Sequence, residues 1–425
     1  MKLLIKNGRV IDPSSGTDET LDILIDKGKI IDFKPKIEAE SSRIIDASRL
    51  VVAPGFIDMH AHLREPGQED KEDIHTASQA AAKGGFTSLC AMPNTNPIND
   101  NRGVTEYILS EAKKRALVNI FPIASITKCL RGEELTDMAD LASAGAVAFS
   151  DDGKCIQDSR VMRRALEYSN LLQTLIIDHC EDFNLSREGL MHEGFSSHLF
   201  GLKGIPASAE DIMVARDVIL AGAARARVHI AHLSTRGAAY LVREARKRKI
   251  KVTAEVTPHH LILTDSALEN YDANLKVNPP LRSHDDVQAL LEAVKDGVVD
   301  VFATDHSPHT PEEKDVEFDR APFGIDGLET AVSLLLDKLV NKNVISLPRF
   351  IDMISTKPAQ ILGLKDKGRI AVGADADLTI LNLHKEVVVD VHKFASKSRN
   401  TPFHGWKLKG TPVMTIVAGN TVYPF

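Results

Sequence analysis

Residues 51–67 read VVAPGFIDMHAHLREPG, an apolar run that passes through a Pro-Gly pair into two histidines separated by one residue. Alternate side chains of a β-strand share a face. This spacing therefore predicts that His60, His62 and Arg64 point the same way from one strand or its end. Two imidazoles that converge from one strand are typical of a metal site, and a guanidinium beside them suits a carboxylate or phosphate. The tripeptide alone is a weak signal, so the rest of the chain must supply further ligands.

The composition is that of a globular protein. The chain has 425 residues, of which 43% are hydrophobic and 26% charged, close to the usual values. Its 52 basic and 59 acidic residues leave no basic surplus, which argues against a nucleic-acid partner. Four scattered cysteines without a C-x-x-C pair fit a reducing cytoplasm. We expect no signal peptide and no membrane span, because no apolar run reaches the required length.

The two ends of the chain share a pattern of short apolar runs typical of strands, which the middle lacks. Apolar runs near the N-terminus are separated by Lys-Asn-Gly and Asp-Lys-Gly, which are turn signals. The C-terminal residues repeat this style in LTILNL, KEVVVD and PVMTIV. We therefore predict one composite β-domain, built from residues 1–53 and 368–425, with a catalytic domain of residues 54–367 inserted between its halves.

The middle of the chain alternates strands with amphipathic or Ala-rich helices. Helices are expected at 73–84, 208–226 and 235–249. Eight strands that alternate with helices form a parallel sheet, and eight strands close a TIM (β/α)8 barrel. The expected strands are 55–62, 86–92, 118–125, 146–152, 174–180, 227–234, 251–258 and 300–306.

Polar side chains recur where these strands end. In a TIM barrel the chemistry lies at the carboxyl ends of the strands, and buried polar groups without partners are costly. Core packing does not explain so many at one end of the barrel, so the pattern predicts a metal centre. The residues concerned are His60, His62, Asn94, Asp151, Asp152, His179, His232, His259, His260, Asp305, His306 and His309.

The motifs as a set resemble those of the metal-dependent amidohydrolases, and more closely those of class I dihydroorotases. The resemblance spans the barrel, and HLREPG together with TDHSPH is its most specific part. The matching segments are GFIDMHAHLREPG at 55–67, AMPNTNP at 91–97, FSDDG at 149–153, DHCED at 178–182, HIAHLST at 229–235, EVTPHHL at 255–261, KVNPPLR at 276–282 and ATDHSPH at 303–309.

The resemblance implies one or two zinc ions per chain. His60, His62 and Asp305 match ligands of the first ion, and His179 and His232 match those of the second. Asp152 matches the ligand on the fourth strand, with Asp151 as the alternative, because a shift of one residue turns a side chain to the other face. Hydantoinases and allantoinases place a carbamylated lysine at that strand end. The Asp-Asp pair found here favours a dihydroorotase.

The resemblance also implies the substrate contacts and the reaction. The reaction would be the interconversion of N-carbamoyl-L-aspartate and (S)-dihydroorotate in pyrimidine (UMP) biosynthesis. Asp305 would take a proton from the attacking water and return it to the departing amide nitrogen. His259, His260 and His306 are expected to be structural or to support the ligands. The implied substrate contacts are His62, Arg64, Asn94, Asn278, His309, Phe323 and Gly324.

Two other functions stay open on the sequence. The first is another cyclic-amide hydrolase of the hydantoinase or allantoinase type, although an uncharged hydantoin would have no use for Arg64 as a partner of a carboxylate. The second is an inactive barrel kept as a scaffold subunit, which the complete ligand set disfavours. Expected partners are further copies of the chain, as a homo-oligomer, and an aspartate carbamoyltransferase as a candidate partner enzyme.

Overall fold

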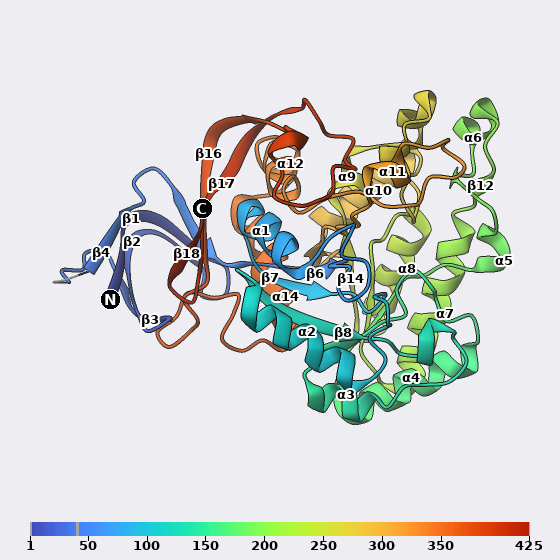
Figure 1. Cartoon of the computed structure of the whole chain (residues 1–425), viewed down its shortest axis with the longest axis horizontal. Coiled ribbons are helices and arrows are strands. Elements are labelled where there is room, and N and C mark those ends of the chain that lie inside the picture. The colour runs from blue at the N-terminus through green and yellow to red at the C-terminus, as the bar shows by residue number, and fades with distance from the viewer. Residues whose placement is uncertain (1, 40–41, 425) are drawn as a thin grey trace.

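The computed structural model describes residues 2–39 and 42–424, which fold around two eight-stranded sheets. Figure 1 shows the first and last parts of the chain together at one end of the molecule, with the barrel and its helices beside them. This is the predicted α/β architecture, a TIM-like barrel with an additional β-domain.

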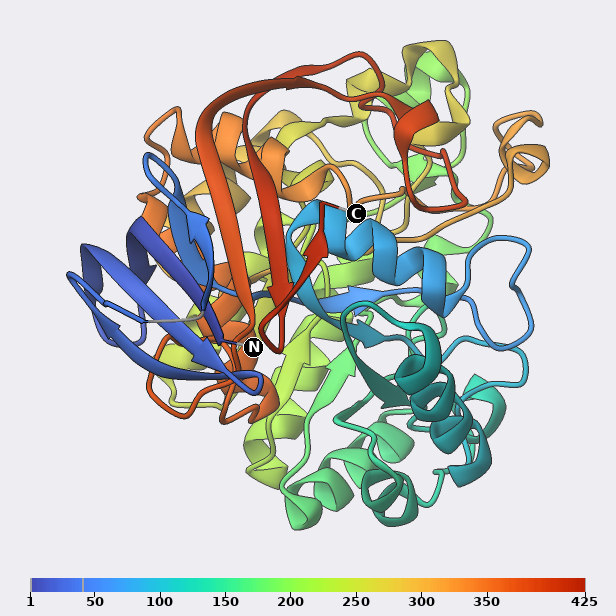
Figure 2. The same ribbon diagram turned by 60° about the vertical axis from the view of Figure 1, so that its left-hand side comes forward.

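The first sheet contains strands from both ends of the chain. Its order is β18-β17-β16-β5-β1-β2-β3, and β4 pairs with β1. The two halves meet where β16 lies antiparallel to β5, with Leu378 opposite Pro54. Figure 2 shows the blue and orange-red strands side by side. The composite sheet is therefore confirmed, while the domain boundaries stay a prediction. The strands are β1 Lys2–Asp12, β2 Thr17–Asp26, β3 Lys29–Lys34, β4 Ser42–Asp46, β5 Val51–Pro54, β16 Leu378–Val388, β17 Lys407–Val417 and β18 Asn420–Tyr423.

One of the two predicted N-terminal turns is wrong. Lys-Asn-Gly lies inside the single strand β1, where the register with β2 shifts between Ile5 and Gly8. Asn7 has φ 60°, which is typical of a β-bulge. A Cβ on Gly8 would lie 2.6 Å from Val52 Cγ2, so glycine is required there. The other signal does form the β2–β3 turn, with positive φ at Lys27.

The second sheet is the barrel, and each of its strands lies within the range predicted for it. The strands run parallel in the order β15-β14-β13-β10-β9-β8-β7-β6. A bridge between Ala61 and His306 closes the ring, and the amide of His62 donates to the carbonyl of His306 at 2.9 Å. The strands are β6 Phe56–Ala61, β7 Phe86–Ala91, β8 Asn119–Ala124, β9 Ala148–Phe149, β10 Ile176–Asp178, β13 Val228–Ile230, β14 Val252–Val256 and β15 Val301–Phe302.

Helices cover the outside of the barrel. Those predicted at 73–84, 208–226 and 235–249 are confirmed as α1 Ile74–Gly84, α7 Ser208–Ala224 and α8 Arg236–Lys247. The other α-helices are α2 Arg102–Arg115, α3 Met138–Ala144, α4 Ser159–Leu172, α5 Phe183–Ser186, α6 Phe195–Phe200, α9 Pro258–Ile262, α10 His284–Lys295, α11 Pro311–Lys314, α12 Ala331–Leu335, α13 Leu347–Ile351 and α14 Lys357–Leu362. Shorter elements are η1 Lys128–Leu130, η2 Asp265–Asn270, η3 Ala273–Leu275, η4 Leu336–Val340, η5 Asp352–Thr356, η6 Val391–Lys393, β11 Met191–His192 and β12 Gly204–Ile205.

Aromatic side chains pack together near the amino ends of the first two barrel strands. Phe56 packs edge-to-face on Phe86 and Phe350, with ring centroids 6.4 and 5.7 Å apart, an arrangement that ring quadrupoles favour. Apolar packing at this end leaves the carboxyl end for polar side chains. Across the described residues, no helix is both long enough and apolar enough to cross a membrane.

Candidate active site

Six of the polar residues at the strand ends gather in one buried cluster, which we call the mouth cluster. Each is at most 5% exposed. The cluster contains two overlapping triads, His60–His62–Asp305 and His60–Asp152–His232, in which one ligand-type atom per residue lies within 4.8 Å of the others. The members of the mouth cluster are His60, His62, Asp152, His179, His232 and Asp305.

Short distances join the imidazoles to the carboxylates. Nε2 of His60 lies 3.5 Å from Asp305 Oδ1, and Nε2 of His62 lies 3.3 Å from the same oxygen. On the other side, Nε2 of His60 lies 3.4 Å from Asp152 Oδ1, and Nε2 of His232 lies 3.8 Å from it. The structure therefore brings together ligand atoms from strands far apart in the sequence.

Two of these atoms have no hydrogen bond although they are fully buried. They are Nε2 of His60 and Oδ1 of Asp152. An unsatisfied buried acceptor is costly, and imidazole nitrogens and carboxylate oxygens are the atoms that zinc binds. Nδ1 of His179 also faces Nε2 of His232 at 3.0 Å. A cation between these groups would satisfy them, so the donor set fits a metal centre.

Two glutamates hold the histidines from behind, and the sequence analysis missed both. Glu255 Oε1 lies 2.7 Å from Nδ1 of His60, and Glu181 Oε2 lies 3.0 Å from Nε2 of His179. Such partners set the orientation and tautomer of a metal-binding imidazole. A signal was present: Glu255 interrupts the apolar strand β14, and a glutamate in a strand buried on both faces needs a partner.

The charges of the cluster favour ionised carboxylates. Burial lowers the pKa of His60, but Asp152 and Glu255 outweigh burial and raise that pKa well above its usual range. Burial raises the pKa of Asp152, but the imidazoles of His60 and His232 bring it well below its usual range. The pKa of Asp305 is lowered by the same balance, through His62 and His60. Anionic oxygens facing imidazoles suit a divalent cation.

The two aspartates that follow the fourth barrel strand, β9, have different contacts. Asp151 accepts from the backbone amides of Ile126 and Thr127, at 2.8 and 3.0 Å, and from the Thr127 hydroxyl. Its acceptor capacity is therefore taken up by the loop after β8. Asp152 instead faces His60 at 3.4 Å and His62 at 3.5 Å. The geometry favours Asp152 over Asp151 as the ligand.

Arg64 reaches the same pocket, but not through strand alternation. Strand β6 ends at Ala61, and Arg64 has φ 63°. The predicted strand alternation therefore does not extend to Arg64, although this residue lines the same pocket as His62. Its Nη2 donates to Ser307 Oγ at 2.9 Å and its Nε to the Pro308 carbonyl at 3.1 Å. Within residues 2–39 and 42–424 no carboxylate lies within ion-pair distance of the guanidinium; burial lowers the pKa of Arg64 to about 10, and Asp305 and Glu313 oppose this lowering from farther away.

The other predicted substrate contacts line this pocket too. The Nδ2 of Asn278 donates to Glu181 Oε2 at 2.9 Å, and His309 Nε2 lies 2.9 Å from the carbonyl of Phe323. Asn94 also lines the pocket, and its Oδ1 lies 2.9 Å from Nδ1 of His62. The lining residues are His62, Arg64, Asn94, Asp152, Gly153, His179, His232, Val277, Asn278, Asp305, Ser307, His309, Phe323 and Gly324.

The other three histidines of the predicted set, His259, His260 and His306, are buried, and their supporting role stays a prediction. His306 is fully buried, with Nδ1 2.9 Å from Asp326 Oδ1. His260 bonds to Thr257 Oγ1 and to the carbonyl of Pro279. Burial lowers the pKa of His259 to about 4, which keeps that ring neutral.

A further group of metal-type residues, which we call the flank cluster, lies outside the barrel interior. It consists of Asp178, Cys180 and Asp217. Asp178 and Cys180 flank His179 in sequence, and alternate residues point to opposite faces. Arg216 lies among these side chains, with Nε 2.7 Å from Asp217 and Nη2 3.5 Å from Asp178.

Comparisons with known proteins agree with this fold. A family model described as Amidohydrolase family matches residues 210–423, and one described as Dihydro-orotase-like matches residues 48–238. The L-hydantoinase (dihydropyrimidinase) of Arthrobacter aurescens has a TM-score of 0.90 and 26% identity, covering 99% of this chain and 95% of that one. The dihydropyrimidinase of Brevibacillus agri NCHU1002 has a TM-score of 0.86 and 25% identity, with the same coverage. The class of protein is thus the amidohydrolases, which are metal-dependent.

Curated relatives narrow the class. A dihydroorotase of Pelotomaculum thermopropionicum is 53% identical over 422 residues, which cover 99% of this chain and 98% of the relative. A dihydroorotase of Citrifermentans bemidjiense is 53% identical over 424 residues, with full coverage of both chains. The chain belongs to the dihydroorotase family, hydrolases that act on cyclic amide bonds.

Proposed function

We propose that the protein is a zinc-dependent dihydroorotase that interconverts N-carbamoyl-L-aspartate and (S)-dihydroorotate in UMP biosynthesis. The observation that carries this proposal is the mouth cluster beside an arginine that forms no ion pair among the described residues. The cluster offers unsatisfied buried ligand atoms, and Arg64 offers a charge for a substrate carboxylate.

One or two zinc ions would be held by the mouth cluster. His60, His62 and Asp305 would bind the first, and the second would be bound by His179, His232 and Asp152. This assignment is supported by the distances among these side chains. When bound, zinc supplies Lewis acidity that polarises the amide carbonyl and lowers the pKa of a water.

Asp305 would move the proton. Its carboxylate lies at the end of β15, 3.3 Å from Nε2 of His62. The neighbouring imidazoles hold its pKa below the usual range, so it is ionised at neutral pH and can accept a proton from the attacking water. Asp305 then returns that proton to the ring nitrogen, which would otherwise leave as a poor anion. Reversal of the same transfer serves ring closure.

The substrate would be held by charge and by the pocket wall. Arg64 would bind the α-carboxylate, assisted by Asn94 through its amide nitrogen. Asn278 and His309 would contact the ring, as would the backbone around 323–324. This is supported by the pocket, which all of these residues line. His62 would contribute to both the metal and the substrate.

A hydantoinase-type activity is the second candidate, because the solved structures reported above are hydantoinases or dihydropyrimidinases. Two features argue against it. The fourth strand carries Asp152 where a carbamylated lysine would bridge the metals in those relatives, and Arg64 would be left without a carboxylate to bind. An inactive scaffold is disfavoured by the complete ligand set.

We further propose that the enzyme acts in the cytoplasm as a homo-oligomer, with an aspartate carbamoyltransferase as candidate partner. Exposed apolar side chains on neighbouring helices α7 and α8 support self-association: Ile212 is 49% exposed, Ile219 59% and Tyr240 60%. Apolar groups that gather on one face are typical of interfaces. Sedimentation of the purified protein, alone and with the carbamoyltransferase, tests both associations.

The decisive experiment measures metal content and turnover on one preparation. We expect one to two zinc ions per chain and turnover of dihydroorotate, followed by loss of its absorbance, with hydantoin and allantoin as competing substrates. Less than ~0.2 metal per chain in an unchelated preparation would contradict the metal centre, since such ligand sets bind tightly. Faster turnover of hydantoin than of dihydroorotate would favour the second candidate.

A further inference from the structure

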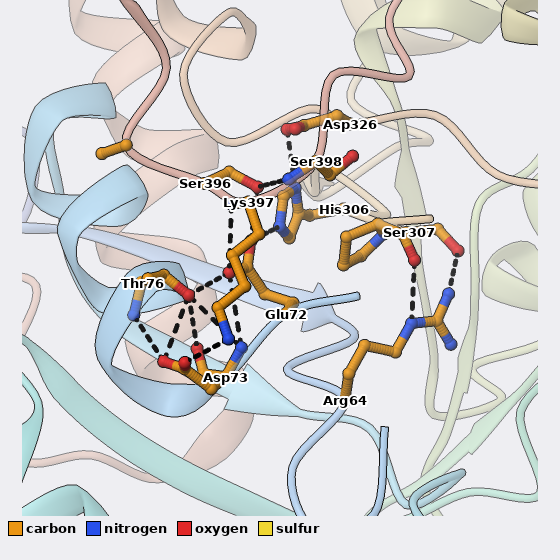
Figure 3. A network of polar contacts seen from close by, with 12 residues as sticks. Arg64, Glu72, Asp73, Thr76, His306, Ser307, Asp326, Ser396, Lys397 and Ser398 are labelled. Atoms are coloured by element: carbon orange, nitrogen blue, oxygen red, sulfur yellow. Dashed lines mark hydrogen bonds and ion pairs between the residues drawn. The ribbon is translucent and has the colours of Figure 1, made fainter. Parts of the chain in front are cut away.

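The residues 394–401, between η6 and β17, form a segment that we call the C-terminal strap. It packs against the barrel near the start of α1. Nζ of Lys397 lies 2.6 Å from Asp73 Oδ2, and the hydroxyl of Ser396 donates to Glu72, as Figure 3 shows. The strap is therefore anchored to the barrel by buried and charged contacts, although it belongs to the C-terminal part of the chain.

One strap residue, Asn400, joins two walls of the pocket. Its side chain is buried, with 3% of the residue exposed. Nδ2 donates to the carbonyls of Ser307 and Gly324, each at 3.0 Å. Oδ1 accepts from the amide of His309 at 3.0 Å and from the hydroxyl of Ser398. All four hydrogen-bonding positions of the amide are used, and three of them hold backbone at the pocket.

The segment that Asn400 holds also accepts the hydrogen bonds of Arg64. The hydroxyl of Ser307 and the carbonyl of Pro308 accept the two hydrogen bonds of the guanidinium, and Figure 3 shows Arg64 beside Ser307. The fit is close, because Gly324 has φ 147° and a Cβ there would lie 2.8 Å from the Ser307 carbonyl oxygen. A shift of residues 307–309 would therefore move the guanidinium.

We propose that Asn400 is a positioning residue for substrate binding, which aims Arg64 into the pocket by fixing residues 307–309. Asn400 is not among the residues that line the pocket, so it acts through its neighbours. The inference rests on the proposed function, in which Arg64 binds the substrate carboxylate. Through Asn400, the C-terminal part of the chain contributes to substrate affinity.

The test compares steady-state kinetics of Asn400→Ala and Asn400→Asp with the wild type. The aspartate keeps the size and the acceptors but sets a carboxylate oxygen against two carbonyl oxygens. We expect KM for dihydroorotate to rise about 10-fold to 100-fold, because small misplacements of a binding group have effects of this size. We expect kcat and zinc content to stay close to wild type, which is the signature of lost binding rather than lost chemistry.

Thr379→Val is the matched control. Thr379 is also buried, and its hydroxyl donates to the carbonyl of Gly85 at 2.6 Å and accepts from the amide of Phe56 at 3.2 Å. It ties the C-terminal part of the chain to the opposite end of the barrel. This variant loses buried hydrogen bonds but leaves the residues around the mouth cluster unchanged, so its KM should match that of the wild type.

A double-mutant cycle with Arg64→Ala tests the route of the effect. If Asn400 acts through Arg64, Asn400→Ala adds little in the Arg64→Ala background, because coupled residues are not additive. Additive effects, or a wild-type KM in Asn400→Ala, would overturn the proposal. If Asn400→Ala does not fold, Ser398→Ala takes its place, because that change removes only one hydrogen bond to Asn400. An unchanged KM in Ser398→Ala would contradict the proposal. Inactive wild type and control would instead refute the proposed function.

Discussion

The mouth cluster and the flank cluster are built from similar side chains, one on each side of the residues that follow β10. His179 points into the barrel, whereas Asp178 and Cys180 point outward, where Asp217 joins them. The flank cluster has its own cation, because the Arg216 guanidinium contacts both carboxylates. In the mouth cluster, imidazoles face the carboxylates and Arg64 makes no ion pair with them among the described residues.

The difference teaches that proximity of ligand-type residues does not define a metal site. In the flank cluster burial lowers the pKa of Arg216, but Asp217 and Asp178 outweigh burial and raise it, so the guanidinium stays charged, while burial and Asp217 raise the pKa of Asp178 well above its usual range. In the mouth cluster Nε2 of His60 and Oδ1 of Asp152 have no hydrogen bond. The acids of the flank cluster have a cation of the chain beside them, although Asp178 Oδ1 also lacks a hydrogen bond, whereas the mouth cluster would take its cation from outside.

The largest effect should come from Asp305→Asn in the mouth cluster. An amide cannot shuttle a proton, and loss of a general acid–base group costs ~10²–10⁴ in rate, to which the loss of a metal ligand adds. We expect turnover to be abolished in both directions, measured as kcat together with metal content. A folded, zinc-loaded variant with more than ~10% of wild-type kcat would contradict the role given to Asp305.

Arg64→Ala tests whether Arg64, beside the mouth cluster, binds the substrate carboxylate. In the flank cluster, by contrast, Arg216 contacts carboxylates of the chain itself. Loss of a buried charged hydrogen bond costs about 2–5 kcal/mol. We therefore expect kcat/KM to fall about 30-fold to several thousand-fold, mostly through KM, with zinc retained. A KM equal to that of the wild type would refute the assignment.

Glu255→Gln tests the support of the mouth cluster. The change removes the charge that orients His60 without changing the shape of the side chain. Loss of such a partner typically weakens metal affinity about 10-fold to 100-fold, and competition with a chelator measures it. Zinc affinity equal to that of the wild type would show that His60 needs no carboxylate behind it.

The smallest effect should come from Cys180→Ser in the flank cluster. Burial raises the pKa of this thiol well above its usual range, and the Arg216 cation already lies beside the neighbouring acids, so we expect no metal here. We expect the zinc content per chain to be unchanged and the free energy of unfolding to fall by about 0.5–3 kcal/mol, as for most buried changes. Loss of zinc in this variant would break the comparison between the clusters.

Local patterns in the sequence predicted much of this molecule. The eight barrel strands follow from short apolar runs between helical segments, and the six residues of the mouth cluster follow from the rule that strand ends carry the chemistry. Other features depend on contacts between distant segments. Nothing around residue 400 signals that its side chain meets 307, 309 and 324, and Lys6-Asn7-Gly8 reads as a turn unless the pairing with β2 is known. Tertiary contacts decide such cases.

The pairing of β5 with β16 has a consequence for the order in which the chain is made. Pro54 leaves the ribosome more than 300 residues before its partner Leu378, a delay of roughly 15–65 s at ~5–20 residues per second. During that time one edge of β5 has no strand to bond, and such an edge invites pairing with other chains. A transcript truncated before codon 378 would leave this edge open permanently, and we expect its product to aggregate.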